Sequence, residues 1–163
     1  MIKIIFMRKP FQLIISVLVP VLVGAVSGYF TASSVKAWFT TLNKPSFNPP
    51  SYIFAPVWTT LYILMGIAFY LIWIKATDMA QQRKAMIMYF IQLFLNFCWS
   101  FIFFYKERPD LAFIEIVFLW ASIVATLALF YRISKPAGWL LVPYLLWVSF
   151  ASVLNYAIWQ LNP

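Results

Sequence analysis

Long apolar runs without a charged residue dominate this chain. The uncharged runs are residues 10–35, 45–74, 85–105 and 136–163. A fifth run, 111–131, contains one charge, Glu115. A helix needs about 20 apolar residues to cross the hydrocarbon core of a bilayer, so each run is long enough for one span. Backbone groups in lipid must be hydrogen-bonded within the segment, and no run alternates in polarity as a strand would, so the runs are predicted to be helices.

The composition excludes a soluble domain. Hydrophobic residues make up 64% of the chain and charged residues 10%, whereas about a quarter of a soluble domain is charged. The net charge of +8 does not indicate nucleic-acid binding, because the basic residues flank the apolar runs and form no stripe along one element. With Cys98 as the one cysteine and no histidine, no intrachain disulfide, no metal site and no conventional acid–base catalysis are predicted.

We therefore predict an all-α integral membrane protein whose residues 1–163 form a single bundle of five transmembrane helices. The predicted helices cover about 10–33, 51–75, 85–105, 111–131 and 139–160. Basic residues favour one side of the membrane, with eight near the N-terminus and the even-numbered loops and four near the odd-numbered loops. Because basic loops stay in the cytoplasm, we expect the N-terminus inside and the C-terminus outside.

The loop between the first two helices, residues 34–50, is unlike the other loops. It contains Trp38, Phe39, Leu42 and Phe47, which would be badly placed in water. It ends in two prolines, Pro49 and Pro50, which lack the backbone donor that would extend a helix backwards. We expect a folded lid over the outer mouth of the bundle. The alternative is an aromatic anchor lying in the membrane interface.

Three of the predicted helices each carry a stripe of aromatic and amide side chains at helical spacing. The stripes are Trp58, Tyr62 and Phe69; Gln92, Asn96, Trp99 and Phe103; and Tyr144, Trp147, Ala151 and Asn155. Such stripes are typical of hydrogen-bonded helix contacts in membranes. They are equally typical of a cavity for a flat, largely apolar ligand. The residues themselves leave both interpretations open.

Two further features have open alternatives. Glu115 is the one ionisable side chain deep within a predicted span, and such carboxylates usually serve a function. It also lies near enough to the helix end to reach outward or to pair with Arg108. The sequence Gly24-x-x-x-Gly28 permits close backbone approach, either in a homodimer or against another helix of the same bundle.

Several segments together resemble the tryptophan-rich sensory protein/translocator protein family, also called peripheral-type benzodiazepine receptors. The matching segments are WFTTLNKPSFNPP (38–50), PVWTTLY (56–62), Leu95-Asn96, Trp99, Ile102-Phe-Phe104, Pro143-Tyr-Leu-Leu-Trp147 and Leu154-Asn-Tyr156. The resemblance extends over roughly residues 24–160 at consistent spacing. It implies five helices and a ligand pocket closed by the first loop.

The resemblance also implies which molecules and residues meet in that pocket. Members of this family bind porphyrins such as protoporphyrin IX and isoquinoline-type drugs, and no cofactor is required. By motif, the ligand-binding residues are Trp58, Tyr62, Asn96, Trp99, Phe103, Trp147, Ala151 and Leu154. The lid residues are Trp38, Phe47, Pro49 and Pro50. If porphyrin is broken down in light, Trp58 and Trp147 are the candidates for electron donation, and whether the chain is an enzyme stays open.

The chain departs from the family pattern at two positions. The sterol-recognition stretch of animal members ends in a basic residue where this chain has Gln160, so sterol binding is not expected. Phe47 stands where tryptophan is usual in the lid. The function we expect is tetrapyrrole sensing, sequestration or light-dependent breakdown; the alternative is a transporter or a lipid-binding scaffold without turnover. The simple charge bias and the lack of a targeting extension favour a bacterial cytoplasmic membrane, with membrane lipid as a partner.

Overall fold

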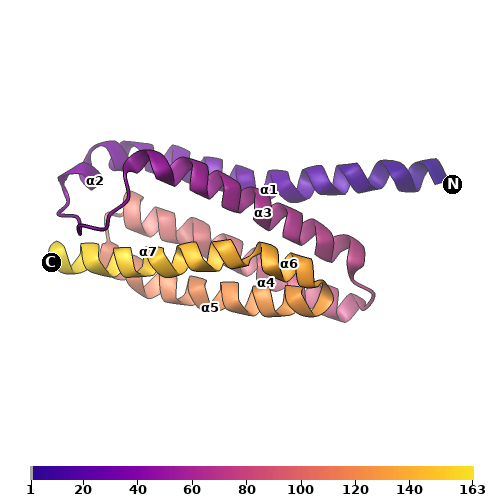
Figure 1. The fold of residues 1–163 in the computed structure, drawn as a ribbon. Helices are drawn as coiled ribbons and strands as arrows, with labels where there is room; N and C mark the ends of the chain where they lie inside the picture. The colour runs from indigo at the N-terminus through magenta and orange to yellow at the C-terminus, as the bar shows by residue number, and fades with distance from the viewer. Residues whose placement is uncertain (1) are drawn as a thin grey trace.

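The computed structural model describes the backbone of residues 2–163 and the side chains from Lys9 onward. Long helices make up most of the described chain (Figure 1). In chain order they are α1 (Ile2–Lys36), α2 (Trp38–Thr41), α3 (Ser51–Lys75), α4 (Met79–Ser100), the π-helical segment η1 (Phe101–Tyr105), α5 (Pro109–Ile133), α6 (Lys135–Leu140) and α7 (Val142–Leu161). The side chains of Lys3 and Arg8, which entered the predicted orientation, lie outside the described residues.

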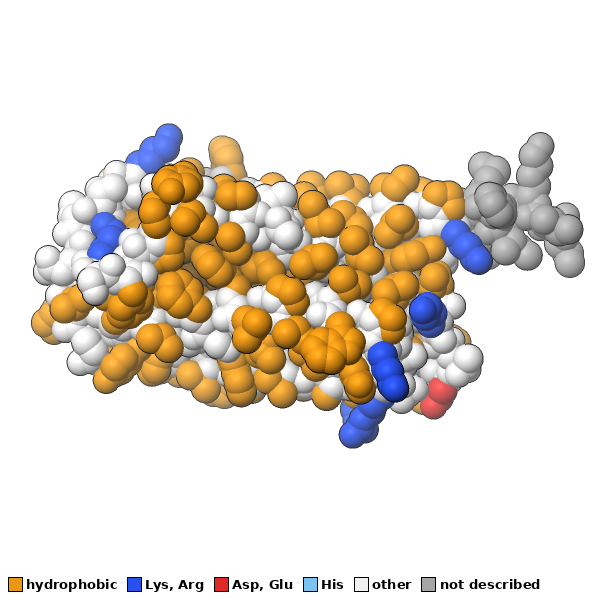
Figure 2. Space-filling view, viewed as in Figure 1, with side chains coloured by type: hydrophobic (Ala, Val, Ile, Leu, Met, Phe, Trp, Pro, Cys, Tyr) orange, Lys and Arg blue, Asp and Glu red, His pale blue; other side chains and the backbone are white. Residues whose placement is uncertain are grey.

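Five helical segments are long and apolar enough to cross a membrane. They are Lys9–Lys36, Ser51–Lys75, Met79–Tyr105, Pro109–Ile133 and Lys135–Leu161. Hydrophobic side chains cover the middle of the face seen in Figure 2, and the lysine and arginine side chains lie towards its two ends. The prediction of an all-α bundle of five transmembrane helices is therefore confirmed.

The helices run alternately up and down, and the start of α1 and the end of α7 lie at opposite ends of the bundle (Figure 1). The most extensive contacts join α4 to α5 and α1 to α3. Met65 and Ile72 of α3, Ile116 of α5 and Val148 of α7 are fully buried. α1 and α3 approach closely at Gly66, where an added Cβ would lie 2.5 Å from the Val17 Cα and 2.7 Å from the Ser16 carbonyl oxygen.

α4 begins at Met79, whereas the uncharged run predicted a start at residue 85. Asp78 is its N-cap, and the Oδ1 atom accepts hydrogen bonds from the backbone N–H of Ala80 at 2.8 Å and of Gln81 at 3.4 Å. A carboxylate in this position satisfies donors that the first helical turn leaves free. The first turns of α4 are therefore polar helix that precedes the apolar run.

Two of the five spans are interrupted. The last turn of the third span is π-helical, and the Lys106 N–H donates a hydrogen bond to the Phe101 carbonyl five residues earlier at 3.0 Å. The last span divides into α6 and α7 at Leu141, just before Pro143, which has no backbone N–H to donate. Such π-helical segments are frequent at functional sites, and η1 carries Phe103 of the predicted pocket.

Candidate functional site

Asn96 of α4 joins α3 and α7 in the interior of the bundle. Its Oδ1 accepts a hydrogen bond from the Tyr62 hydroxyl at 2.7 Å, and its Nδ2 donates to the Tyr144 hydroxyl at 3.2 Å. All three side chains are buried. Water is absent at this depth of a bilayer, so each of these polar groups depends on the others for a partner. The three predicted stripes therefore meet in one polar contact.

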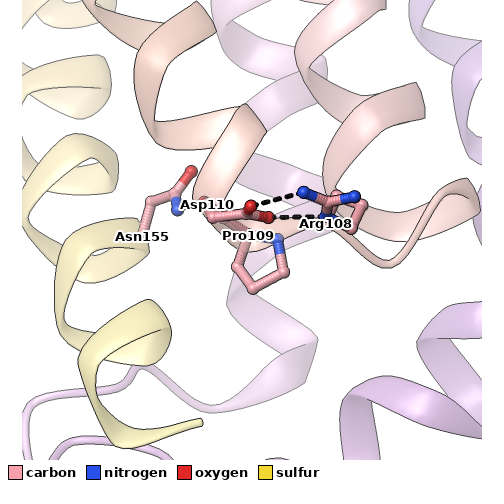
Figure 3. A network of polar contacts seen from close by, with 4 residues as sticks. All are labelled: Arg108, Pro109, Asp110 and Asn155. Carbon is pink, nitrogen blue, oxygen red and sulfur yellow. Dashed lines mark hydrogen bonds and ion pairs between the residues drawn. The ribbon is translucent and has the colours of Figure 1, made fainter. Parts of the chain in front are cut away.

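A second amide, Asn155 of α7, connects α7 to α4 and to the start of α5, nearer the end of the bundle. Its Oδ1 accepts from the Trp99 indole N–H at 3.0 Å, and its Nδ2 donates to the Pro109 carbonyl at 2.7 Å. Figure 3 shows the Asn155 amide facing the start of α5, beside the ion pair of Arg108 with Asp110. Asn96 and Asn155 thus make the hydrogen-bonded helix contacts of the first interpretation. The ligand cavity of the second interpretation stays a prediction.

The predicted aromatic residues surround these amides in three groups of contacts. Trp58 stacks on Tyr62 with 5.6 Å between ring centroids, and its ring lies edge-on to Tyr144 at 6.3 Å. Trp99 lies 5.4 Å from Phe103 of η1. The third group comprises Trp147 with Phe54 and Phe150, at 5.9 and 5.6 Å.

Ala151 and Leu154 complete the eight predicted residues. Both are buried on α7, on the turns between Trp147 and Asn155. Trp58 and Trp147 keep part of their surface exposed, whereas the other six predicted side chains are buried. We call these eight residues the aromatic site. Its side chains pack against their neighbours, so a ligand would have to displace some of these contacts.

The loop 34–50 folds back over the aromatic site. Trp38 of α2 packs edge-on against Phe103 at 5.8 Å, and Phe39 packs against Phe103 and Phe104 at 6.2 and 5.5 Å. Phe47 is 47% exposed and reaches Phe150 at 6.4 Å. Pro49 and Pro50 lead directly into α3 at Ser51. These contacts favour the lid over the interfacial anchor.

The lid is also bonded to the C-terminal end of α7. The Asn43 backbone N–H donates to the Asn162 Oδ1 at 2.9 Å, and the Asn162 Nδ2 donates to the Asn43 carbonyl at 3.0 Å. A longer bond joins the Asn43 Nδ2 to the Leu161 carbonyl at 3.4 Å. This connection could not be predicted from the sequence, because the two asparagines are more than a hundred residues apart and neither lies in a helical stripe.

Several residues that contact the aromatic site were not predicted, although their spacing in the sequence pointed to them. Phe54 is one turn before Trp58, and Phe150 is one turn after Trp147, so helical spacing places each beside a predicted residue. Phe39 and Phe104 follow predicted residues directly. Tyr144 was assigned to a stripe but not to the ligand-binding set, and the structure makes it a hydrogen-bond partner of Asn96.

One predicted alternative for Glu115 was a pair with Arg108. The structure does not contain this pair. Arg108 donates instead to both carboxylate oxygens of Asp110, at 2.8 and 2.6 Å (Figure 3). The two carboxylate oxygens of Glu115 are buried and have no hydrogen-bond partner among the described residues. The alternative fails because Asp110 is two residues from Arg108 and offers both oxygens in an exposed position.

Gly24 makes room for the aromatic site. A Cβ at this position would meet three atoms of the Tyr62 ring at less than 3 Å. At Gly28 an added Cβ would meet no atom within 4 Å. Gly24 therefore allows α1 to pack closely against Tyr62 of its own bundle, whereas no described side chain lies against the Cβ position of Gly28.

A sequence model of the TspO/MBR family matches residues 16–160. The chain belongs to this family. The match includes every residue of the aromatic site and the whole lid, and it confirms the resemblance found from the motifs.

Relatives from all three domains of life are similar to this family member over most of their length. Tryptophan-rich protein TspO of Chlorobaculum tepidum is 46% identical over 141 residues, which cover 86% of this chain and 89% of the relative. The protein of the same name from Archaeoglobus fulgidus is 40% identical over 93% of this chain and 97% of its own length. Translocator protein of Bos taurus is 35% identical over 89% of this chain and 86% of its own.

Family membership and the five spans together make the chain an integral membrane protein. Two cavities in the described part of the chain lie elsewhere in the bundle, along α1 and α4, and share no residue with the aromatic site.

Proposed function

We propose that this chain binds a flat tetrapyrrole such as protoporphyrin IX, and isoquinoline-type drugs, in the aromatic site beneath the lid. The observation that supports the proposal most is the arrangement of Trp58, Trp99 and Trp147 on three helices around Asn96 and Asn155. Such a site offers broad apolar surfaces together with a few fixed polar groups, which is the usual chemistry of small-molecule sites.

The physiological role we propose is tetrapyrrole sensing, sequestration or light-dependent breakdown. Porphyrin is itself a photosensitiser, and an indole is among the side chains most easily oxidised. Trp58 and Trp147 are the electron donors in this proposal because, of the residues of the aromatic site, these two are partly exposed. No other co-reactant from the protein is required for the first electron transfer.

Binding in this proposal begins with movement of the lid. Six of the eight residues of the aromatic site are buried by their neighbours, and Trp38 covers Phe103. A tetrapyrrole is larger than any gap between packed side chains, so the lid and the rings beneath it separate as the ligand enters. The energy for this rearrangement comes from the apolar area that the ligand buries.

The decisive experiment combines purified full-length protein in detergent micelles with protoporphyrin IX, in the light and in the dark. Saturable binding in the dark supports the site, and a new product formed in light only with protein supports breakdown. If porphyrin binds but no product forms in light, breakdown is excluded, and sensing or sequestration is the role that the result supports. A chain that moves porphyrin across sealed vesicles, with no new product, supports the alternative of a transporter. If porphyrin binding does not saturate, the proposed function is wrong.

A further inference from the structure

A second hollow opens on the other half of the bundle, away from the lid. It has a volume of about 370 Å³ and lies between α1, α3 and α4. Its walls include Ser16, Phe69, Trp73, Gln82, Tyr89 and Phe90. We call it the inner hollow. Sites for small molecules usually measure about 300–1,000 Å³, so the inner hollow is large enough to hold a ring-sized group.

Two hydroxyl groups at the walls of the inner hollow have no partner. Ser16 is 2% exposed and Tyr89 is 1% exposed, and neither hydroxyl oxygen has a hydrogen-bond partner among the described residues. A buried polar group left without a partner destabilises the folded protein. Lipid tails supply no partner, so these two groups call for an explanation.

Ser16 differs from three other hydroxyl side chains within the transmembrane helices. Ser149 and Ser152 of α7 each donate to the carbonyl one turn earlier, at 2.8 Å, and Thr31 of α1 does so at 2.9 Å. Ser16 makes no such bond. Its backbone is held in place by the close contact with Gly66. The Ser16 backbone is therefore fixed at the wall of the hollow, and its buried hydroxyl group is left free to donate.

The aromatic walls are flat and firmly packed. The Tyr89 ring lies 4.7 Å from the Phe69 ring and stacks on Phe130 at 5.9 Å between centroids. Phe69 also contacts Phe90 and Trp73, at 5.5 and 6.0 Å. Aromatic rings held in this way favour a flat ring as a guest.

The inner hollow continues into an apolar groove. The groove has a volume of about 390 Å³, and its walls are valine, leucine and phenylalanine side chains of α1 and α4. Val19 and Phe90 line both cavities. Phe90 and Phe94 are 48% and 66% exposed on this face, so the groove meets the lipid directly. A ligand can enter it sideways from the bilayer.

The lack of charged residues in the two cavities restricts the kind of ligand that can bind there. No lysine, arginine, aspartate or glutamate of the described chain lines either of them. A charged head group would lose its hydration without gaining a counter-charge, which is costly in a membrane. The guest is therefore neutral where it meets the hydroxyl groups of Ser16 and Tyr89.

We propose that the inner hollow and the apolar groove together bind an isoprenoid quinone. The flat, neutral quinone ring would lie in the inner hollow, where its carbonyl oxygens accept hydrogen bonds from Ser16 and Tyr89. The prenyl tail would follow the apolar groove between α1 and α4. This site is separate from the aromatic site in location and residues, so it goes beyond the proposed function and does not depend on it.

The test uses decylubiquinone as the probe and the purified full-length protein in detergent micelles. We expect saturable binding, seen as quenching of tryptophan fluorescence, and a smaller quenching amplitude in a Trp73→Phe variant. The double variant Ser16→Ala/Tyr89→Phe removes only the two hydroxyl oxygens, and it should bind about tenfold more weakly. Decylubiquinone should raise the melting temperature of the wild type more than that of this variant.

A matched control removes two hydroxyl groups that line neither cavity. The double variant Ser152→Ala/Tyr131→Phe should bind decylubiquinone as the wild type does. Wild-type affinity in Ser16→Ala/Tyr89→Phe, or quenching that never saturates, would overturn the proposal. It also fails if cholesterol, which has no flat carbonyl-bearing ring, competes as well as decylubiquinone. Competition by protoporphyrin IX with the same sensitivity to Ser16 and Tyr89 would show one shared site instead of two.

Discussion

Asn96 shows how a single amide can organise the interior of this bundle. Its two polar atoms satisfy two tyrosine hydroxyls on two different helices. An aliphatic side chain of similar size would pack equally well but would leave both hydroxyls unpaired at about 1–3 kcal/mol each. Asn96 therefore both stabilises the fold and fixes the positions of the polar groups in the aromatic site.

Trp58 and Trp147 test whether the protein takes part in porphyrin photochemistry. Neither indole N–H donates a hydrogen bond to a described residue, so phenylalanine keeps most of the apolar contact and loses only the easily oxidised ring. We expect Trp58→Phe and Trp147→Phe to bind protoporphyrin IX within about tenfold of the wild type, or 1.4 kcal/mol. Light-dependent loss of bound porphyrin should nevertheless slow sharply.

The measurement is the bleaching rate at saturating porphyrin, with occupancy determined separately in the dark. Trp139→Phe is the matched control, because Trp139 is 63% exposed and lies on α6, outside the aromatic site. A wild-type rate in the variant that lacks both Trp58 and Trp147 would mean that the dye and oxygen act alone.

Ala151 tests the position of the ligand. It is buried on α7 beside Trp147, so Ala151→Leu adds bulk where the porphyrin is proposed to lie. Overpacking of this kind typically costs about 1–3 kcal/mol, and we expect porphyrin affinity to fall by that amount. Dark titration of the purified variant gives the value.

The control for Ala151→Leu is Val153→Leu on the same helix. Val153 is 59% exposed, so extra bulk there should leave binding unchanged. Equal affinity in a folded Ala151→Leu variant would remove this residue from the site.

At the scale of elements, the lid is held by two kinds of contact. Its aromatic side pairs Trp38 with Phe103, and its polar side bonds Asn43 to Asn162. The π-helical η1 lies beneath the first contact, and the end of α7 lies beneath the second. Opening of the lid therefore requires both an aromatic and a hydrogen-bonded contact to break.

Asn162→Ala should make the lid open more easily. The change removes two hydrogen bonds to Asn43, each contributing about 0.5–1.5 kcal/mol. We expect both the association and the dissociation rate of protoporphyrin IX to rise several-fold, with a smaller change in affinity, because closed and open lids differ in access to the site. Stopped-flow fluorescence measures both rates. Gln160→Ala, an exposed amide on the same helix end, should behave as the wild type, and rates equal in all three proteins would exclude this latch.

At the scale of the whole molecule, the charges at the two ends of the bundle indicate its orientation. Among the described side chains, one end carries Lys9, Lys75, Arg83, Lys84, Arg132 and Lys135, and the other carries Lys36, Lys44, Lys106 and Arg108. We propose that the first end faces the cytoplasm, since basic loops are retained there. The lid and the aromatic site then face the outside of the cytoplasmic membrane.

A reporter enzyme that works only in the cytoplasm tests this orientation. Fused after Pro163, it should be inactive, whereas the same reporter fused within the loop between α3 and α4 should be active. Strong activity at the C-terminus would reverse the orientation and place the lid inside the cell.

The helical class and the five spans were predictable because membrane insertion depends on local properties. A run of about 20 apolar residues has no stable alternative to a helix in lipid, whatever its neighbours do. The family could also be recognised from short motifs such as residues 38–50. The stripes through Asn96 and Asn155 followed from helical spacing alone.

Tertiary structure decided what spacing could not. Whether an amide faces a ligand or another helix depends on which helix lies opposite, and only the fold brings Tyr62 and Tyr144 to Asn96. The hydrogen bonds between Asn43 and Asn162 join segments that share no pattern in the sequence. The same is true of Ser16 and Tyr89, which line one wall of the inner hollow. Contacts between distant segments arise from packing of the whole bundle, and they leave no periodic signal in the chain.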